Sequence, residues 1–371
     1  MMNHKERQSN FEHGRAAKIG ILVCNLGTPD APNSRAVRRF LREFLSDVRV
    51  IELPRLLWLP ILHGFVLRLR PRRSAAAYAK IWGEDGSPLM AISLRQGAAL
   101  RAAMEAKLPG RTAVEVAMRY GNPSISTGLR KLREMNARKI FVLPLYPQYA
   151  GSSTGSVFDA VSAELGRWRW VPTIRFLNDY HADELYIRAL AKSVQTYWAK
   201  HGRGNHLLIS FHGTPKTSLL RGDPYHCQCQ ATARLLAEHL QVSESDWSIG
   251  FQSRFGWNEW LQPYTTTRLQ KLGSEGLKQV DVVCPGFAVD CLETLEEIEL
   301  QYNKEFIKSG GGSLRYIPAL NDSPDHIDML TSLTLRNIAG WNEAEPNWDS
   351  SLDKSKREAV KIRADRMKNH L

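Results

Sequence analysis

The chain has 371 residues and a formal net charge of +12, with 43% hydrophobic and 24% charged residues. This composition is typical of a globular protein and excludes an intrinsically disordered chain. The length suits two domains, each with its own core. The sequence contains no apolar run of about 18 residues, so we expect no membrane-spanning helix. The N-terminal residues are polar and lack the apolar segment of a signal peptide, so we expect a cytoplasmic protein.

The surplus of basic residues would attract nucleic acid, anionic lipid or an acidic small molecule. The arginines are spread along the chain without a DNA- or RNA-binding motif, so we expect no nucleic-acid partner. The cysteines are odd in number and three of them lie in or beside apolar runs, which argues against a secreted disulfide framework and favours a reducing compartment. They stand at positions 24, 227, 229, 284 and 291.

Apolar strands alternate with amphipathic helices along the chain, a pattern that predicts an α/β fold with mainly parallel sheets. The expected strands cover residues 19–25, 113–118, 139–143, 173–176, 206–211, 248–252 and 279–284. The expected helices cover residues 34–45, 92–107, 123–135, 182–200, 228–240, 292–307 and 324–338.

These strands fall into two sets divided around residues 177–205, and each set has the size of one doubly wound unit. We therefore predict two Rossmann-like, doubly wound lobes that face one cleft. Ligands of such sheets bind beyond the carboxyl ends of the strands. The expected division is a flexible N-terminus (1–17), a first lobe (18–177), a second lobe (178–320), a closing helix (321–342) and a charged, mobile tail (343–371).

An apolar segment at residues 56–69, here called the apolar lip, interrupts the first lobe and leads into a run of arginines at 68–73. Pro60 and Gly64 break it, and it is too short to span a bilayer. Apolar side chains bordered by arginines suit the interface of an anionic membrane. A buried core helix with a solvated end explains the pattern equally well.

Two further segments of the first lobe follow strands. Arg119 and Tyr120 could bind a carboxylate and form an aromatic wall, or could be a surface arginine beside a packed ring. The segment LPLYPQYAGSSTG, at 143–155, leads into a helix, whose free N–H groups and hydroxyls suit an anion or simple capping. No G-x-G-x-x-G follows the first strand, so the dinucleotide fingerprint is absent.

In the second lobe, His212 ends an apolar strand before Gly213 and should project into the cleft, where an imidazole can accept protons or bind a metal. Glu293 and Glu297, with Gln301, are spaced to share one face of a helix. Asp290 as N-cap with Glu293 three residues later also approaches a capping box, so a structural role explains Glu293 as well as a chemical one.

Taken together, the motifs resemble the ferrochelatase family, most closely its proteobacterial branch, from about residue 19 to residue 338. The histidine motif with its downstream G-D-P-Y and the block G-F-x-x-D-x-x-E-T-L-E-E are the most specific. The matching segments are NLGTP, YAKIWGEDGSPLM, MRYGNP, LPLYPQYAGSSTGS, LISFHGTP, RGDPY, FQSRFG and CPGFAVDCLETLEEI.

The resemblance implies a lyase that inserts Fe²⁺ into protoporphyrin IX to form protohaem, the terminal step of haem synthesis. It implies His212 and Glu293 as catalytic residues and metal ligands, and Glu297 with Asp290 on a path for protons or metal. A peripheral contact with the cytoplasmic face of the membrane is also implied. The residues implied in porphyrin binding are Leu26, Arg119, Tyr120, Tyr146, Ser152 and Trp260.

The sequence departs from the family pattern in its cysteines. Cys291 stands where many relatives carry histidine, which puts an imidazole role there in doubt. Some relatives hold a [2Fe–2S] cluster through cysteines near the C-terminus, but here no cysteine follows Cys291 and the pair Cys227 and Cys229 cannot supply four ligands. We therefore expect no cluster and no permanently bound cofactor, with Fe²⁺ as a substrate.

Three other hypotheses about the function remain open at this point. A cobalt or sirohydrochlorin chelatase would share the architecture, although its hydrophilic substrate would not need the apolar lip. A haem carrier or sensor would retain haem through an axial ligand without inserting metal. A sugar- or phosphate-binding module would use the glycine-serine segment.

Overall fold

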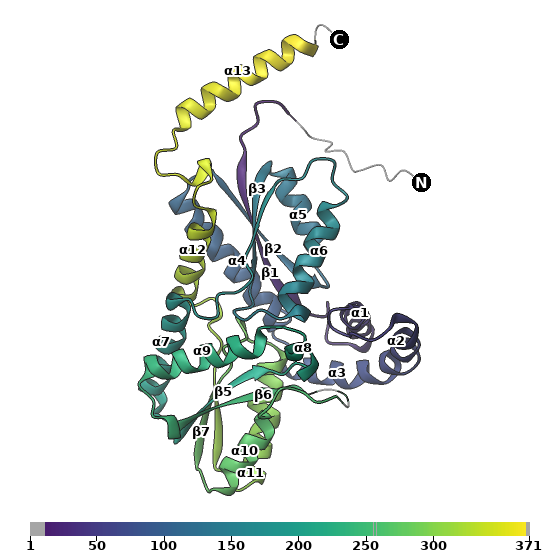
Figure 1. The fold of residues 1–371 in the computed structure, drawn as a ribbon, viewed down its shortest axis with the longest axis vertical. Helices are drawn as coiled ribbons and strands as arrows, with labels where there is room; N and C mark the ends of the chain where they lie inside the picture. Colours follow the sequence, from purple (N-terminus) through teal and green to yellow (C-terminus); the bar gives the residue numbers. More distant parts are fainter. Residues whose placement is uncertain (1–11, 255, 257, 369–371) are drawn as a thin grey trace.

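The computed structural model describes residues 12–254, 256 and 258–368, and its strands form two four-stranded sheets (Figure 1). The strand orders are β2-β1-β3-β4 and β6-β5-β7-β8, and every pair of neighbours is parallel. The predicted α/β class with two Rossmann-like lobes is confirmed. The strands span Lys18–Gly27 (β1), Thr112–Tyr120 (β2), Ala137–Pro144 (β3), Thr173–Phe176 (β4), His206–His212 (β5), Trp247–Gln252 (β6), Gln279–Val283 (β7) and Ser313–Ile317 (β8).

Helices flank both sheets (Figure 1). Some of their starts follow from the sequence: the Asn33 side chain caps the first helix by accepting from the Ala36 N–H at 3.0 Å. The longer helices span Ser34–Leu45 (α1), Pro88–Lys107 (α4), Ile125–Glu134 (α5), Ser156–Leu165 (α6), Glu184–His201 (α7), Tyr225–Leu240 (α9), Thr265–Ser274 (α10), Pro324–Ile338 (α12) and Ser350–Lys368 (α13). Short helical segments span Lys216–Leu220 (α8), Glu244–Asp246 (η3), Asn303–Lys308 (α11) and Asn342–Ala344 (η5).

The structure differs from the expected elements in several places, among them the helices of the lip and of the tail described below. The edge strand β8 was not predicted, because it has only five residues and directly follows a glycine run that indicates a turn. The helix expected at 292–307 begins as an eleven-residue π-helix, Leu292–Tyr302 (η4), and becomes α-helical only in α11. A second π-helical segment, Gly151–Gly155 (η2), precedes α6. Such wider turns are rare and occur often at functional sites.

One buried apolar cluster runs continuously from the first sheet to the second. It joins Ile21 of β1 to Ile209 of β5, and it includes the inner faces of α7, α9 and α12. In particular, Leu190 of α7 and Leu330 of α12 lie within this cluster. The two lobes therefore share a core, and the carboxyl ends of their strands are held in a fixed relation to each other.

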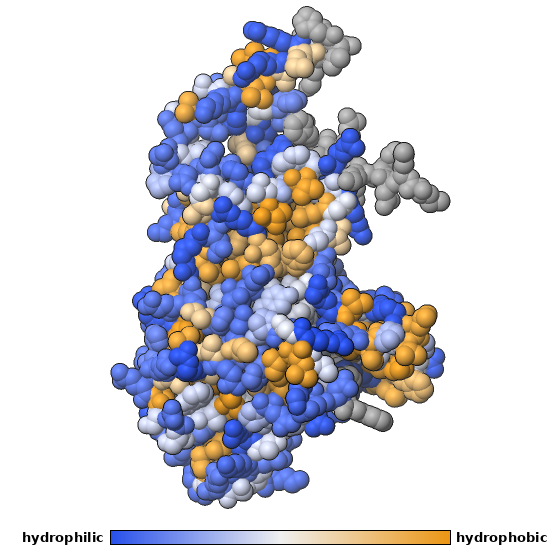
Figure 2. Space-filling model, in the orientation of Figure 1, coloured by the Kyte–Doolittle hydropathy of each residue, from blue (hydrophilic) through white to orange (hydrophobic). Residues whose placement is uncertain are grey.

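The apolar lip folds into three consecutive helical segments that project from the first lobe: Arg55–Ile61 (α2), Leu62–Val66 (η1) and Leu67–Ile81 (α3). One face is buried core, as Trp58 and Leu62 show, whereas Leu56 is 90% and Leu69 74% exposed. Figure 2 shows the resulting apolar surface at the edge of the molecule. The core explanation therefore holds for one face, and contact of the exposed apolar face with a membrane stays a prediction.

The charged tail contains α13, which lies at the far end of the first lobe, away from the lip (Figure 1). Its Arg357 donates a hydrogen bond to the carbonyl of Gly14 at 3.4 Å. The mobility expected for this tail stays a prediction.

Candidate active site

His212 is the last residue of β5, and its imidazole stands at the carboxyl edge of the second sheet. The Nδ1 atom lies 2.6 Å from the carbonyl oxygen of Gly213. Because a carbonyl can only accept, Nδ1 carries the hydrogen, and the lone pair of the neutral ring is on Nε2. The ring lies near the side chains of Trp260 and Phe287, with centroid separations of 6.4 and 6.5 Å. His212 thus lies at the carboxyl end of its strand beside two aromatic rings, and its role as a base stays a prediction.

Glu293 lies at the start of η4, outside the capping box of this helix. Cys291 is the N-cap, and its backbone N–H donates to the hydroxyl of Thr294 at 3.0 Å, which completes a capping box of Cys291 and Thr294. The expected capping box of Asp290 and Glu293 is therefore wrong, because a threonine hydroxyl already occupies the required position. Glu293 is not part of this capping box, although its side chain and backbone contact the thiol of Cys291.

Gln252 connects these two residues. It pairs with His212 in the register of β5 and β6, and its carbonyl accepts from the Gly213 N–H at 2.8 Å. Its side-chain Nε2 donates to the carbonyl of Glu293 at 2.9 Å. Since Gln252 is 2% exposed, these bonds form inside the protein. The structure therefore brings His212 and Glu293 to the same edge of one sheet.

Two residues of α3 that the sequence reading missed also face Glu293. Burial raises the pKa of the Tyr78 hydroxyl, and the charge of Glu293 raises it further. Burial and the nearby Arg73 lower the pKa of Arg70, while Glu293 opposes both effects. The lip helices therefore contribute a phenol and a guanidinium to the surroundings of Glu293. Their spacing on α3 gave no sign of this, because the partner lies more than 200 residues away in the chain.

Glu297 is held farther along η4. Its carboxylate accepts from the backbone N–H of Ser253 at 2.9 Å, from the Ser253 hydroxyl at 2.5 Å and from Tyr302 at 2.5 Å. The predicted shared face with Gln301 is wrong, because in the π-helix the partners are five residues apart and Gln301 binds Glu296 instead.

Asp290, expected on the same path, is buried just before η4. Its carboxylate accepts from the Tyr316 hydroxyl at 2.7 Å, from the Asn321 amide at 2.7 Å and from the Ala319 N–H at 3.2 Å. These bonds fix the turn before η4 to the segment that follows β8.

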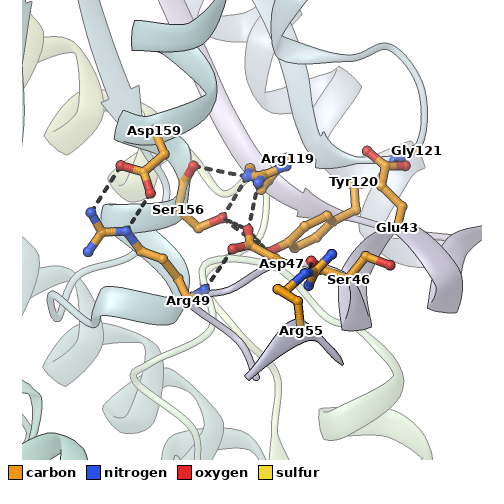
Figure 3. A network of polar contacts seen from close by, with 10 residues as sticks. All are labelled: Glu43, Ser46, Asp47, Arg49, Arg55, Arg119, Tyr120, Gly121, Ser156 and Asp159. Atoms are coloured by element: carbon orange, nitrogen blue, oxygen red, sulfur yellow. Dashed lines mark hydrogen bonds and ion pairs between the residues drawn. The ribbon is translucent and has the colours of Figure 1, made fainter. Parts of the chain in front are cut away.

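Arg119 and Tyr120, at the end of β2, lie in a closed network around Asp47 (Figure 3). Both donate to Asp47 Oδ2, Arg119 Nη2 at 2.5 Å and the Tyr120 hydroxyl at 2.8 Å, and Ser156 Oγ donates to the same oxygen at 2.5 Å. Burial alone would raise the pKa of the Asp47 carboxyl. The hydrogen bonds from Ser156 and Tyr120, a further hydrogen bond from the backbone N–H of Arg49 and the charge of Arg119 together lower this pKa. Asp47 was missed because the sequence alone does not place the loop after α1 beside β2.

A cavity of about 620 Å³ borders this network, between α1 and the end of β2. Arg119 and Asp47 line it together with His63 of the lip, but neither His212 nor Glu293 does. The structure therefore places Arg119 in an ion pair and beside a polar cavity, apart from the edge that holds His212.

The other expected porphyrin-binding residues come from several segments. Leu26 packs, partly buried, between the shared core and the lip. Within the described residues, Tyr146 Oη and Trp260 Nε1 are buried without a hydrogen-bond partner. Ser152 lies in η2, where the first N–H, that of Gly151, already donates to the Asp223 carboxylate at 2.7 Å. The anion-binding site predicted at this helix start is thus occupied in part by the carboxylate of Asp223, from the second lobe.

Among the described residues, no three histidine, cysteine or acidic side chains form a cluster that could hold a metal ion. No helix within the same described ranges has the length and apolarity needed to cross a membrane. His212 and Glu293 can each still offer one ligand to an iron ion that is passing to another acceptor.

The ferrochelatase family model matches residues 18–338. A ferrochelatase of Thioalkalivibrio sulfidiphilus is 56% identical over 357 residues, 96% of this chain and 97% of the relative. The chain belongs to the ferrochelatase family. Another ferrochelatase, of Nitrosococcus oceani, is 54% identical over 91% of both chains. As a member of this family, the chain is an enzyme of haem synthesis that inserts iron into a porphyrin.

A solved structure shows a similar fold. SirB from Bacillus subtilis, determined with Fe³⁺, has a TM-score of 0.53 and 14% sequence identity over 90% of this chain and all of SirB. At this identity the similarity concerns the fold alone. It agrees with the two Rossmann-like lobes described above.

Proposed function

We propose that His212 and Glu293 form the metal-insertion centre of this ferrochelatase, as catalytic residues and as transient ligands of Fe²⁺. The observation that supports this is their meeting at one sheet edge, with Nε2 of His212 carrying the lone pair and Glu293 outside the capping box of η4. Imidazole and carboxylate both bind Fe²⁺, yet two protein ligands hold it weakly enough for a tetrapyrrole to take it.

The proposed chemistry removes two pyrrole protons and replaces them with one Fe²⁺. In a flat macrocycle the nitrogen lone pairs point inward, so a saddled porphyrin exposes them better to a metal that arrives from one face. His212 Nε2 accepts the two pyrrole protons one at a time and releases the first to solvent before it takes the second, while Glu293 delivers the metal. Glu297 extends this acidic track along η4. For Asp290, whose carboxylate is saturated with hydrogen bonds, we propose that it holds the start of η4 beside the track.

For the macrocycle we propose a pocket lined by Leu26, Tyr120, Tyr146, Ser152 and Trp260. The buried, unpaired polar atoms of Tyr146 and Trp260 support this, because a buried donor without a partner costs about 1–3 kcal/mol and favours a ligand that can accept from it. Arg119 stays in the proposal as a propionate ligand, on the condition that a propionate displaces Asp47 from its guanidinium.

We propose protoporphyrin IX as the porphyrin, because its apolar ring edge suits the exposed apolar lip. The test is an anaerobic insertion assay with Fe²⁺ and three acceptors: protoporphyrin IX, coproporphyrin and sirohydrochlorin. We expect the largest kcat/KM for protoporphyrin IX. Faster insertion into sirohydrochlorin would contradict the proposal and favour the other chelatase reading.

We also propose that the enzyme works without a resident iron–sulfur cluster. Burial raises the pKa of the thiols of Cys24, Cys229, Cys284 and Cys291, which disfavours the thiolates that clusters require. Cys227 is the exposed one of the five. The visible spectrum of protein purified anaerobically tests this: cluster absorption that bleaches on reduction would contradict the proposal.

We propose that this enzyme is cytoplasmic and touches the membrane through its lip. Leu56, Leu57, Phe65 and Leu69 are exposed on one side, and the arginines that follow suit anionic headgroups. Co-sedimentation with vesicles tests it: we expect binding to anionic vesicles and loss of binding in a Leu56→Ser/Phe65→Ser variant. The control Leu352→Ser/Val360→Ser, on α13, should bind as the unaltered protein does.

A further inference from the structure

The segment R-G-D-P-Y at residues 221–225 carries contacts that the insertion chemistry does not explain. Asp223 stands just before α9, and its carboxylate spans two segments of the chain. Oδ2 accepts from the backbone N–H of Gly151 at 2.7 Å, and Oδ1 accepts from the backbone N–H of Tyr225 at 3.0 Å. One carboxylate of the second lobe thus holds the first residue of η2 in the first lobe.

Tyr225 continues the connection to the insertion centre. Its ring is 8% exposed, and its hydroxyl donates to the carbonyl of His212 at 2.9 Å. Burial raises the pKa of this phenol well above its ordinary value, so the hydroxyl keeps its proton and its role as donor. Three hydrogen bonds therefore run in sequence from Gly151 through Asp223 and Tyr225 to the backbone of His212.

Other contacts hold the same two segments together. The Tyr149 N–H donates to the side chain of Gln228 on α9 at 2.6 Å, and the Gln148 amide donates to the Thr232 hydroxyl at 2.9 Å. Residues 148–151, which lead into Ser152, are thus bound to α9 and to Asp223 just before it. These contacts hold the segment proposed to bind the porphyrin in the first lobe against α9.

We propose that Asp223 and Tyr225 are positioning residues, which set the distance between the porphyrin-binding segment 148–152 and the imidazole of His212. This inference rests on the role proposed for His212 above. A rigid connection matters here because a misplacement of about 1 Å between a reactant and a catalytic group can cost up to about 100-fold in rate. The Tyr225 hydroxyl contacts only the His212 end of this connection. The Asp223 carboxylate binds Gly151 directly and is linked to His212 through Tyr225.

This division gives the two residues different kinetic effects. In Tyr225→Phe the ring is retained and the His212 carbonyl loses its donor, so we expect kcat to fall about 10-fold with the KM for protoporphyrin IX unchanged within about twofold. In Asp223→Asn an amide N–H faces a backbone N–H, so we expect kcat to fall about 10-fold and KM to rise about 10-fold. The double variant should resemble Asp223→Asn, because both residues belong to one connection.

The matched control is Tyr180→Phe, which removes a buried phenol hydroxyl that has no partner within the described residues. All variants are assayed per active site, titrated with a tight-binding porphyrin, so that loss of folded protein does not imitate a change in kcat. The inference is overturned if Tyr225→Phe matches Tyr180→Phe in both constants, or if the two single effects multiply in the double variant.

His212→Ala, assayed in parallel, separates this inference from the proposed function. If His212→Ala inserts iron at the unaltered rate, the insertion centre itself is wrong, and the inference falls with it. If His212→Ala is inactive while Tyr225→Phe is normal, the insertion centre stands and only the positioning role is contradicted.

Discussion

The two lobes have the same strand order and differ in what lies at the carboxyl ends of their strands. In each lobe the first and third strands are central, and a π-helical segment follows the third strand, η2 in one lobe and η4 in the other. In the first lobe, Arg119 is neutralised internally by Asp47. In the second, His212 carries its lone pair on Nε2 and Glu293 lies outside the capping box of η4. The polar groups at the end of β2 thus bind one another, while the second lobe presents the imidazole of His212 at its sheet edge.

The largest expected effect comes from removing the available acid. Glu293→Gln keeps the size of the side chain and removes its charge, so we expect the insertion rate to fall about 10² to 10⁴-fold. The matched control is Glu299→Gln, an exposed acid on the same π-helix, which should insert iron at nearly the unaltered rate. An equal loss in both variants would mean that η4 contributes general negative charge and no specific carboxylate.

Removing the charge of Asp47 in the first lobe should lower the stability of the protein. Asp47→Asn leaves Arg119, whose side chain is 17% exposed, without its charge partner, so we expect a loss of about 3–5 kcal/mol in the free energy of unfolding. Urea unfolding measures it. For the control Asp159→Asn, whose partner Arg49 is 38% exposed, we expect about 1 kcal/mol or less. Similar losses in the two variants would contradict the view that the Asp47 network closes this lobe.

A smaller effect is expected for His326, a buried histidine that lies outside the candidate active site. Burial lowers the pKa of His326 to about 4. The unfolded chain binds this proton near pH 6.5, so stability falls as the pH decreases from there to about 4, by on the order of 3 kcal/mol. Unfolding of His326→Gln at pH 7 and pH 4.5 should show a weaker pH dependence by nearly this amount. The exposed control His239→Gln should keep the full dependence, and equal slopes would contradict the burial argument.

Much of the fold could be predicted from the sequence, because the periodicity of apolar residues and the turn-forming residues depend only on neighbouring positions in the chain. The helix at 324–338 and the strand at 173–176 agree with the structure at both ends. His212 could be identified because it follows an apolar strand and precedes a glycine. The capping of η4 could not be predicted, because Asp290 and Thr294 both have side-chain oxygens that could cap the helix. Only the structure shows that the Asp290 carboxylate binds Tyr316, whereas the Thr294 hydroxyl accepts from the Cys291 N–H.

The parts that remained hidden depend on contacts between distant segments. Asp47 reaches Arg119 across 72 positions, and Tyr78 faces Glu293 from the lip. The π-helical winding of η4 changes which acids have partners, yet nothing in the residue spacing distinguishes it from an α-helix. The insertion centre therefore needed both the motif and the fold for its description.

The central claim is that His212 provides the base of the insertion centre, and one measurement tests it most directly. His212→Ala is compared with the control His181→Ala, whose Nδ1 instead lies 2.6 Å from Asp179. Iron insertion into protoporphyrin IX is followed by absorbance, and porphyrin binding by quenching of tryptophan fluorescence. We predict that His212→Ala binds the porphyrin within about threefold of the unaltered protein and inserts iron about 10² to 10⁴-fold more slowly, with the control unaffected. Near-normal insertion by His212→Ala would contradict the account.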